Sequence, residues 1–250
     1  MIDYYTLNHS QKSFAQHERD AVYKAIFSRR DVRSKFLDKK IPRSVLVRIL
    51  NAAHHAPSVG FSQPWDFILI NDVKSRERVK QSFVREFQKS VRMLDSDRER
   101  QRKYKSLKLE GILESAMNIC ITYDPTRFGP FVLGRTSIYE TGVYSVCCAI
   151  QNLWLAARAE GLGVGWVSIV SNSEIREILG IPEHVSPIAY LCVGYVSEFE
   201  EIPDLQRTGW LSRLKLENVV CYEKWRAYQS EEWDDLREEI TRSDFNMNLK

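Results

Sequence analysis

The chain has 250 residues, of which 44% are hydrophobic and 28% are charged, and its formal net charge is +3 at pH 7. This composition is typical of a globular protein with a substantial core, and so small a charge argues against nucleic acid as the main partner. No run of about 18 apolar residues predicts a membrane span, and the polar N-terminal sequence lacks a secretory signal, so we expect a cytoplasmic protein. The five cysteines form no CxxC pair, and most lie in apolar runs. We therefore expect buried free thiols, with neither a disulfide nor a metal.

Two helices are expected near the start of the chain. An amphipathic pattern from Glu18 to Phe27 predicts the first. The second begins at Ile41-Pro42, where proline suits the first turn of a helix. It ends before Ala56-Pro57, because the residue that precedes a proline is driven out of the helical region.

Between these helices lies the run Ser28-Arg29-Arg30-Asp31-Val32-Arg33, with three arginines around one carboxylate. A helical turn, or a helix end that runs into a loop, brings two of the guanidiniums to one side. Because a planar guanidinium makes bidentate hydrogen bonds to phosphate oxygens, the run suits a phosphomonoester. Short basic runs are common, however, and taken alone the run favours a solvated basic helix end with an internal salt bridge.

A polar loop from Ser58 to Pro64 leads into a predicted strand from Trp65 to Ile70. Its small residues and hydrogen-bonding groups suit the polar rim of a flat heterocycle, and a plain connecting turn is the other interpretation. The next stretch, Lys74 to Lys108, interleaves basic residues with one narrow apolar stripe. We interpret it as a helix and a mobile flap that covers a site, in preference to a surface for nucleic acid.

The second half of the chain alternates apolar segments with turns. Asn118 to Tyr123 predicts a short buried strand, and Asp124 to Gly134 predicts a loop. A helix from about Ser137 to Glu160 is apolar nearly all round, so it must be covered inside the domain or at a subunit interface. The glycines of Gly161 to Ser168 follow a helix and lack GxGxxG spacing, which indicates a strand with close backbone approach and not a dinucleotide loop.

Toward the C-terminus, Asn172 and Ser173 can cap a short helix that ends at Leu179, and Pro187 to Tyr195 predicts another strand. The hydrophobic stretch Val219 to Trp225 can add a strand to a neighbouring subunit. The tail from Ser230 to Lys250 is charged, and we expect it to be frayed or a surface helix.

Four motifs together resemble the FMN-dependent nitroreductase-like family, and within it the 5,6-dimethylbenzimidazole synthases, the branch that destroys its flavin. The resemblance covers about Ala21 to Trp225 and implies an α+β three-layer sandwich, in which helices flank a central mixed or antiparallel sheet and a C-terminal strand extends to the partner subunit. It implies one FMN-binding domain at 21–229, with an N-terminal extension at 1–20 and a tail at 230–250. The motifs are Arg29–Arg33, Ala56–Trp65, Gly163–Ser168, and Gly209-Trp210 with Arg213.

Position 31 separates the branches of this family. Ordinary nitroreductases usually carry serine there, whereas the synthases carry aspartate, as this chain does. The resemblance therefore implies that Asp31 is the base that takes a proton or hydrogen from the first ribityl carbon, and that Ser168 forms a hydrogen bond beside the ring. Asp66 departs from the family, in which asparagine is often found, and this leaves its contact with the ring open.

The resemblance also implies which residues hold FMN. The phosphate is expected on Arg29, Arg30 and Arg33, with Arg213 a weaker candidate and Arg207 a weaker one still. The ring is expected to contact Ser58, Gly60, Gln63 and Gly165.

The implied reaction consumes reduced FMN and O2 and yields 5,6-dimethylbenzimidazole, the lower ligand of cobalamin, together with erythrose 4-phosphate. A homodimer with two FMN sites at its interface is expected, and a separate flavin reductase supplies the reduced flavin. Two alternatives stay open. One is an NAD(P)H-dependent nitro or quinone reductase that recycles its FMN, and the other is a non-catalytic flavin-binding protein.

Overall fold

The computed structural model describes residues 13–227 and 231–247, and the chain divides into two compact units at Pro203/Asp204. The second unit contains α7 (Asp204–Arg207), η3 (Leu216–Asn218), η4 (Glu231–Trp233) and α8 (Asp234–Met247). The first unit contains α1 (Gln16–Ser28), α2 (Arg43–His54), η2 (Val59–Phe61), β1 (Trp65–Ile70), α3 (Val73–Met93), α4 (Arg98–Ser106), β2 (Met117–Tyr123), α5 (Thr141–Ala159), β3 (Leu162–Val167), α6 (Asn172–Leu179) and β4 (Ser186–Tyr195).

The four strands of the first unit form one antiparallel sheet with the order β1-β2-β4-β3. Of the two sheet types expected from the sequence, the structure contains the antiparallel one. β3 lies at an edge of this sheet, where Val164 pairs on one side with Val193 of β4. On its other side Val164 forms a parallel bridge with Asp31. The arginine run therefore lies directly against the edge of the sheet.

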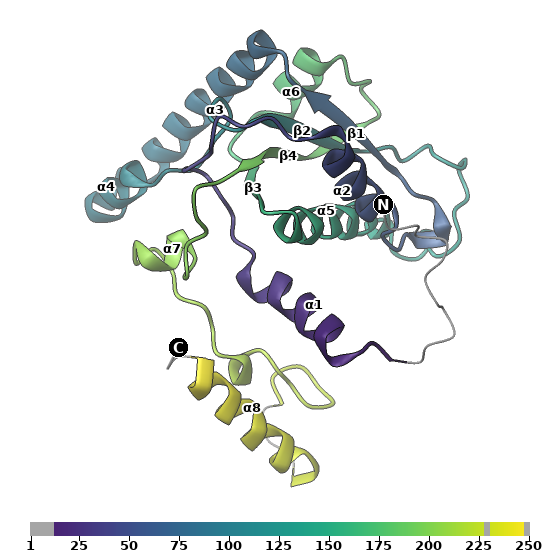
Figure 1. Ribbon diagram of the computed structural model, residues 1–250, viewed down its shortest axis with the longest axis vertical. Coiled ribbons are helices and arrows are strands. Elements are labelled where there is room, and N and C mark those ends of the chain that lie inside the picture. Colours follow the sequence, from purple (N-terminus) through teal and green to yellow (C-terminus); the bar gives the residue numbers. More distant parts are fainter. Residues whose placement is uncertain (1–12, 228–230, 248–250) are drawn as a thin grey trace. The chain divides into compact units, whose positions relative to one another are not determined.

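Helices cover both faces of the sheet, which makes the three layers expected from the sequence (Figure 1). On one face α2 and α5 pack against the strands, and Ile49 and Leu153 are fully buried there. On the other face α3 and α6 contribute the buried Val79 and Ile175. The predicted strands at β1, β2 and β4 are confirmed, and α2 ends ahead of Ala56-Pro57 as expected.

The segment predicted as a helix and a flap consists of α3 and α4. Phe87 stacks on Phe83 of α3 and on Tyr104 of α4, with ring centroids 5.7 and 5.1 Å apart. Gln101 of α4 is buried, and its side-chain amide donates a hydrogen bond to the Val91 carbonyl at 3.0 Å. These contacts tie α4 to α3, so the segment is helical, and its role as a flap stays a prediction.

Several boundaries differ from the sequence prediction. α5 begins at Thr141, four residues after the predicted start at Ser137. The cap of α6 is Ser171, one residue earlier than predicted, because its hydroxyl accepts a hydrogen bond from the Glu174 N–H three positions on. In the second unit residues 219–225 form turns and irregular structure, and the strand predicted there is absent from the single chain. The predicted surface helix of the tail corresponds to α8.

α5 leaves one stripe of its surface uncovered in the single chain. Tyr144, Cys147, Cys148 and Gln151 are exposed, and their spacing of three, four and seven residues places them on one face of the helix. The expectation of buried thiols is therefore wrong for Cys147 and Cys148, although Cys120 and Cys192 are buried. Among the described residues, no helix combines the length and the apolar character needed to cross a bilayer.

Candidate active site

The arginine run leaves α1 in an extended conformation. α1 ends at Ser28, and Arg29 has φ −64° and ψ 138°. Side chains alternate along extended backbone, so Arg29, Asp31 and Arg33 lie on one side of the run and Arg30 on the other. The charged side chains of Arg29, Asp31 and Arg33 thus converge because a helix end runs into an extended loop. They are two residues apart, and not three or four as on a helix.

Two contacts hold the Asp31 carboxylate. The Trp166 N–H donates a hydrogen bond to Oδ1 at 3.0 Å, and an Arg33 guanidinium nitrogen forms an ion pair with Oδ2. The backbone beside it is fixed as well, because the Val32 N–H donates to the Val164 carbonyl at 2.9 Å. The Asp31 side chain keeps 30% of its surface exposed, so it remains accessible from one side.

Burial raises the pKa of Asp31 above its ordinary value. The Arg33 charge, the hydrogen bonds from Trp166 and Arg33, and the Arg29 charge all lower this pKa, but together they do not cancel the cost of burial. From the sequence alone, either burial or the neighbouring arginines could dominate the pKa of Asp31. In the structure burial dominates, so the carboxylate holds its proton more strongly than usual. A group of this kind is a better base than an exposed aspartate.

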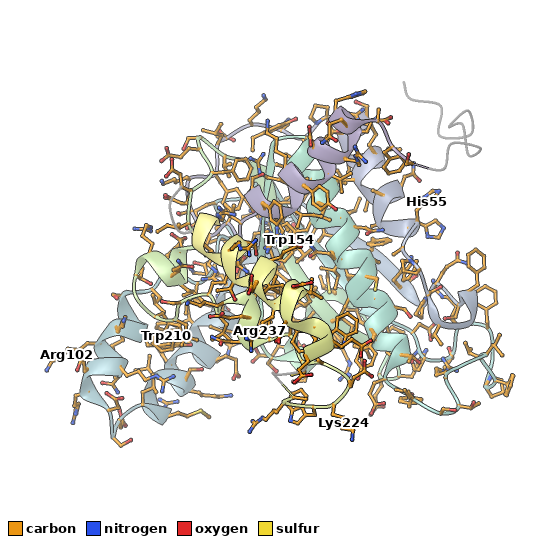
Figure 2. The ribbon with its side chains drawn as sticks, turned by 90° about the horizontal axis from the view of Figure 1, so that it is seen from below. His55, Arg102, Trp154, Trp210, Lys224 and Arg237 are labelled. Carbon is orange, nitrogen blue, oxygen red and sulfur yellow. The ribbon has the colours of Figure 1, made fainter. Side chains whose placement is uncertain are left out.

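Trp154 of α5, which is labelled in Figure 2, contacts the backbone and one arginine of the run. Its indole N–H donates to the Arg30 carbonyl at 3.1 Å, and the Arg29 guanidinium lies 5.0 Å from its ring centroid. Arg30 itself folds back and donates to the carbonyls of Phe27 and Arg29 at 2.8 and 2.7 Å. Arg29 and Arg33 are thus the two arginines that lie beside Asp31.

Gly165 is where the glycine strand and the arginine run meet. A Cβ atom added at Gly165 would lie 2.0 Å from the Val32 carbonyl oxygen and 3.6 Å from Asp31 Oδ1. At Gly163 an added Cβ would lie 3.1 Å from the Val32 side chain. The close backbone approach expected from these glycines is therefore an approach to the protein's own arginine run.

Ser168 follows the last residue of β3 and is exposed. It lines a cavity of about 200 Å³ together with Trp166, whose N–H holds Asp31. Asn172, at the start of α6, and Tyr190 of β4 also line this cavity. Asp31 and Ser168 are thus brought to the same edge of the sheet, on either side of Trp166.

The loop from Ser58 to Trp65 is held by hydrogen bonds from several elements. The Gln63 N–H donates to the Ser58 hydroxyl at 3.1 Å, and the Val59 N–H donates to the Ser145 hydroxyl of α5 at 3.0 Å. Gly60 is exposed with φ +54°, and a side chain there would clash with the backbone of Leu133. The backbone of this segment is thus fixed by α5 and by a hydrogen bond within the loop, and its contact with a flat heterocycle stays a prediction.

Sequence reasoning missed three residues that build this site. From the sequence, Trp154 and Trp166 are interpreted as core residues of an apolar helix and of a strand. Their hydrogen bonds to the arginine run are made across the fold, so the local sequence does not indicate them. Arg127 lies in a predicted loop, and no local pattern marks it as a partner of Asp66. Arg207 and Arg213 belong to the second unit, so their expected contact with a phosphate stays a prediction.

A model of the nitroreductase family matches residues 26–195 of this chain. The chain therefore belongs to the nitroreductase family. A protein of Rhodospirillum rubrum named 5,6-dimethylbenzimidazole synthase is 42% identical over 185 residues, which cover 74% of this chain and 86% of that protein. A protein of Rhodobacter capsulatus with the same name is 32% identical over 208 residues, which cover 82% of this chain and 98% of that protein.

Solved structures agree on the fold. An iodotyrosine deiodinase bound to FMN and 3-iodo-L-tyrosine has a TM-score of 0.64 at 20% identity, and the match covers 82% of this chain and all of that one. A BluB-like flavoprotein of Clostridium difficile has a TM-score of 0.62 at 18% identity, with 81% of this chain and 99% of that chain covered. At this level of identity the comparison shows a shared fold.

The described residues fit the anionic end of FMN. Arg29 and Arg33 present two guanidiniums on one side of the run, and Nε of Arg33 is buried without a hydrogen-bond partner among the described residues. A buried donor of this kind is costly unless a ligand satisfies it. A phosphate is a suitable acceptor, because it binds guanidinium groups through charge-assisted hydrogen bonds.

Replacing Asp31 with asparagine removes a carboxylate whose pKa is raised in the folded protein. The unfolded chain releases this proton near its ordinary pKa of about 3.9, so folding of the wild type loses stability as the pH rises above that value toward the raised pKa. We expect Asp31→Asn to unfold at a higher urea concentration than the wild type at pH 7, and this difference to disappear near pH 3.

The exposed Asp38 provides the control, because Asp38→Asn removes the same charge without burial. Urea titrations of the three proteins between pH 3 and pH 7 make the comparison. A wild type that gains stability relative to Asp31→Asn as the pH rises would contradict a raised pKa.

Substitution of Gly165 by alanine tests the contact between β3 and the run. Because the added Cβ would lie 2.0 Å from the Val32 carbonyl oxygen, the backbone at Asp31 and Val32 must shift. We expect a loss of about 3 kcal/mol in the free energy of unfolding, the upper range for an overpacked site.

Gly180→Ala is the matched control. Gly180 has φ +66° and open space around it, so alanine there meets only backbone strain of about 1 kcal/mol. Equal losses for the two variants in urea unfolding would mean that the contact with Val32 carries no special cost.

Proposed function

We propose that this protein is a 5,6-dimethylbenzimidazole synthase, which consumes reduced FMN and O2 and releases 5,6-dimethylbenzimidazole, the lower ligand of cobalamin, and erythrose 4-phosphate. The observation that carries the proposal is Asp31, a half-buried carboxylate with a raised pKa between two arginines at the edge of the sheet. The names of the relatives that are 42% and 32% identical support it. An acidic residue inside a phosphate site disfavours the phosphate, so it needs a chemical role.

Reduced FMN, when bound, supplies the electrons for its own reaction with O2, and the protein supplies position and proton transfers. Arg29 and Arg33 bind the phosphate, which places the ribityl chain beside the residue between them. Asp31 accepts a proton from the first ribityl carbon. Its two oxygens each keep a free lone pair for this step, since each accepts one contact, from Trp166 or from Arg33.

Ser168 acts at the ring end of the same substrate. Its hydroxyl can donate or accept a hydrogen bond, and it lies two residues from the Trp166 N–H that holds Asp31. Ser58, Gly60 and Gln63 contact the polar edge of the ring. The α3–α4 segment then limits the access of water while the ring reacts.

The alternative is an NAD(P)H-dependent reductase that recycles its FMN. A relative from Archaeoglobus fulgidus supports this alternative. The relative is 27% identical to this chain and is named putative NADH dehydrogenase/NAD(P)H nitroreductase. A reductase needs the arginines but has no use for a base at position 31. A non-catalytic flavin-binding protein needs neither Asp31 nor Ser168.

One experiment separates the three functions. Purified protein is mixed with chemically reduced FMN in air, and the products are identified by mass spectrometry. We expect 5,6-dimethylbenzimidazole from the wild type, and at least a 100-fold slower release from Asp31→Asn, because positioned bases contribute about 100- to 10,000-fold. Asp31→Asn should still bind FMN, since Arg29 and Arg33 remain.

Asp38→Asn is again the control and should form product at the wild-type rate. Undiminished product from Asp31→Asn would reject the role of the base. Turnover of NAD(P)H with intact FMN would support the reductase, and tight binding without chemistry would support the flavin-binding protein.

We further propose that the protein is a homodimer in which α5 is part of the interface. The exposed stripe Tyr144, Cys147, Cys148 and Gln151 lies on a helix whose opposite face is buried in the core. Phe131 and Tyr139, in the loop before α5, are also exposed aromatic side chains. A second copy of the chain covers such a stripe when two α5 helices pack against each other.

Cys147→Glu places a charge in the middle of this stripe. We expect the wild type to sediment as a dimer at micromolar concentration and Cys147→Glu to shift toward monomer, because an unpaired buried charge is costly. Val84→Glu, at a 40% exposed apolar position on α3, is the control and should leave the dimer intact. A wild type that sediments as a monomer would contradict the proposed assembly.

A further inference from the structure

The loop from Ser58 to Trp65 has a strained backbone that needs external support. Phe61 and Gln63 have φ values of +54° and +42°, in the left-handed region that side chains other than glycine rarely adopt. Such residues cost about 1–3 kcal/mol each and persist only where surrounding contacts impose the conformation. Within the loop, the Ser58 hydroxyl accepts a hydrogen bond from the Gln63 N–H, and contacts from outside the loop add to this support.

Arg127, in the loop after β2, makes the contacts that hold this backbone. One guanidinium nitrogen donates to the carbonyls of Gln63 and Trp65 at 3.2 and 2.9 Å, on either side of Pro64. The other donates to both carboxylate oxygens of Asp66, at 2.7 and 2.8 Å. A single side chain thus contacts Gln63, Trp65 and Asp66, along the path that leads from the loop into β1.

Asp66 makes this arrangement rigid. Both of its carboxylate oxygens accept from the same guanidinium nitrogen of Arg127, which makes a charge-assisted contact between the two side chains. An asparagine at this position has one acceptor oxygen and no charge, so it would hold Arg127 less firmly. At position 66, where this chain departs from the resembled family, the aspartate thus has a defined partner in Arg127.

We propose that Arg127 is a positioning residue for FMN, which acts by holding Gln63 in the conformation that contacts the polar edge of the ring. The proposal rests on the function proposed above, since it assigns Gln63 to the flavin ring. Arg127 does not itself touch the flavin. It carries no proton in the reaction, and its effect on binding passes entirely through the loop.

A double-mutant cycle on FMN affinity tests this role. We expect Arg127→Met and Gln63→Ala each to weaken the binding of oxidised FMN about tenfold, a loss of about 1.4 kcal/mol. If Arg127 acts through Gln63, the double variant should be weakened about tenfold and not a hundredfold. Asp66→Asn should weaken binding less than Arg127→Met, because the two backbone contacts of Arg127 remain.

Arg135→Met is the matched control. Arg135 follows in the same loop and donates to the carbonyls of Pro125 and Gly129 at 2.9 and 3.3 Å, inside that loop. Its loss should lower the melting temperature and leave FMN affinity unchanged. Equal loss of affinity in Arg135→Met and Arg127→Met, or a hundredfold loss in the double variant, would overturn the proposal.

The readout also separates this inference from the proposed function. Binding of oxidised FMN, followed by flavin fluorescence, needs no O2 and no fragmentation. A protein that forms no benzimidazole but shows the coupled loss of affinity would reject the synthase and leave Arg127 as a positioning residue. If the protein forms benzimidazole but the losses of FMN affinity in Arg127→Met and Gln63→Ala are additive, the synthase stands and the positioning role of Arg127 is rejected.

Discussion

The site depends on one pairing, in which the segment after α1 lies against the outer edge of β3. The Val32 N–H binds the Val164 carbonyl, and the Trp166 N–H binds Asp31 two residues further along the strand. Residues 135 positions apart in sequence are thereby joined. The glycine strand leaves room for this contact, because a side chain at Gly165 would overlap the Val32 carbonyl. The arginine motif and the glycine motif are therefore two halves of one structural unit.

The same pairing sets the chemistry of Asp31. A carboxylate on a mobile, exposed loop would have an ordinary pKa, whereas a fully buried and unpaired one would cost too much to retain. The contacts with Arg33 and Trp166 reduce the cost of burial without removing it. The result is a carboxylate that stays accessible on one side and is oriented by fixed partners on the other.

Much of the fold could be predicted from the local sequence, because single residues such as proline restrict the backbone conformation and so mark where elements begin and end. Pro42 and Pro57 bracket α2, and alternating or continuous apolar runs mark β1, β2 and β4. The site was predictable only in part. Arg29, Asp31 and Arg33 stand out as a motif, but their common side depends on extended backbone that β3 imposes. Trp154 and Arg127 act through carbonyl groups far along the chain, and no local pattern records such contacts.

The position of β3 at the edge of the sheet has a consequence for handling the protein. An apolar edge strand with open backbone groups recruits strands from other molecules, which leads to aggregation. The run at Asp31 and Val32 occupies part of this edge, through the bridge to Val164. Residues assigned to flavin chemistry thus also shield the sheet from other chains. Variants that release the run from β3 should be lost as insoluble protein during purification. Activity measured on the remaining soluble fraction will therefore underestimate the effect of the substitution.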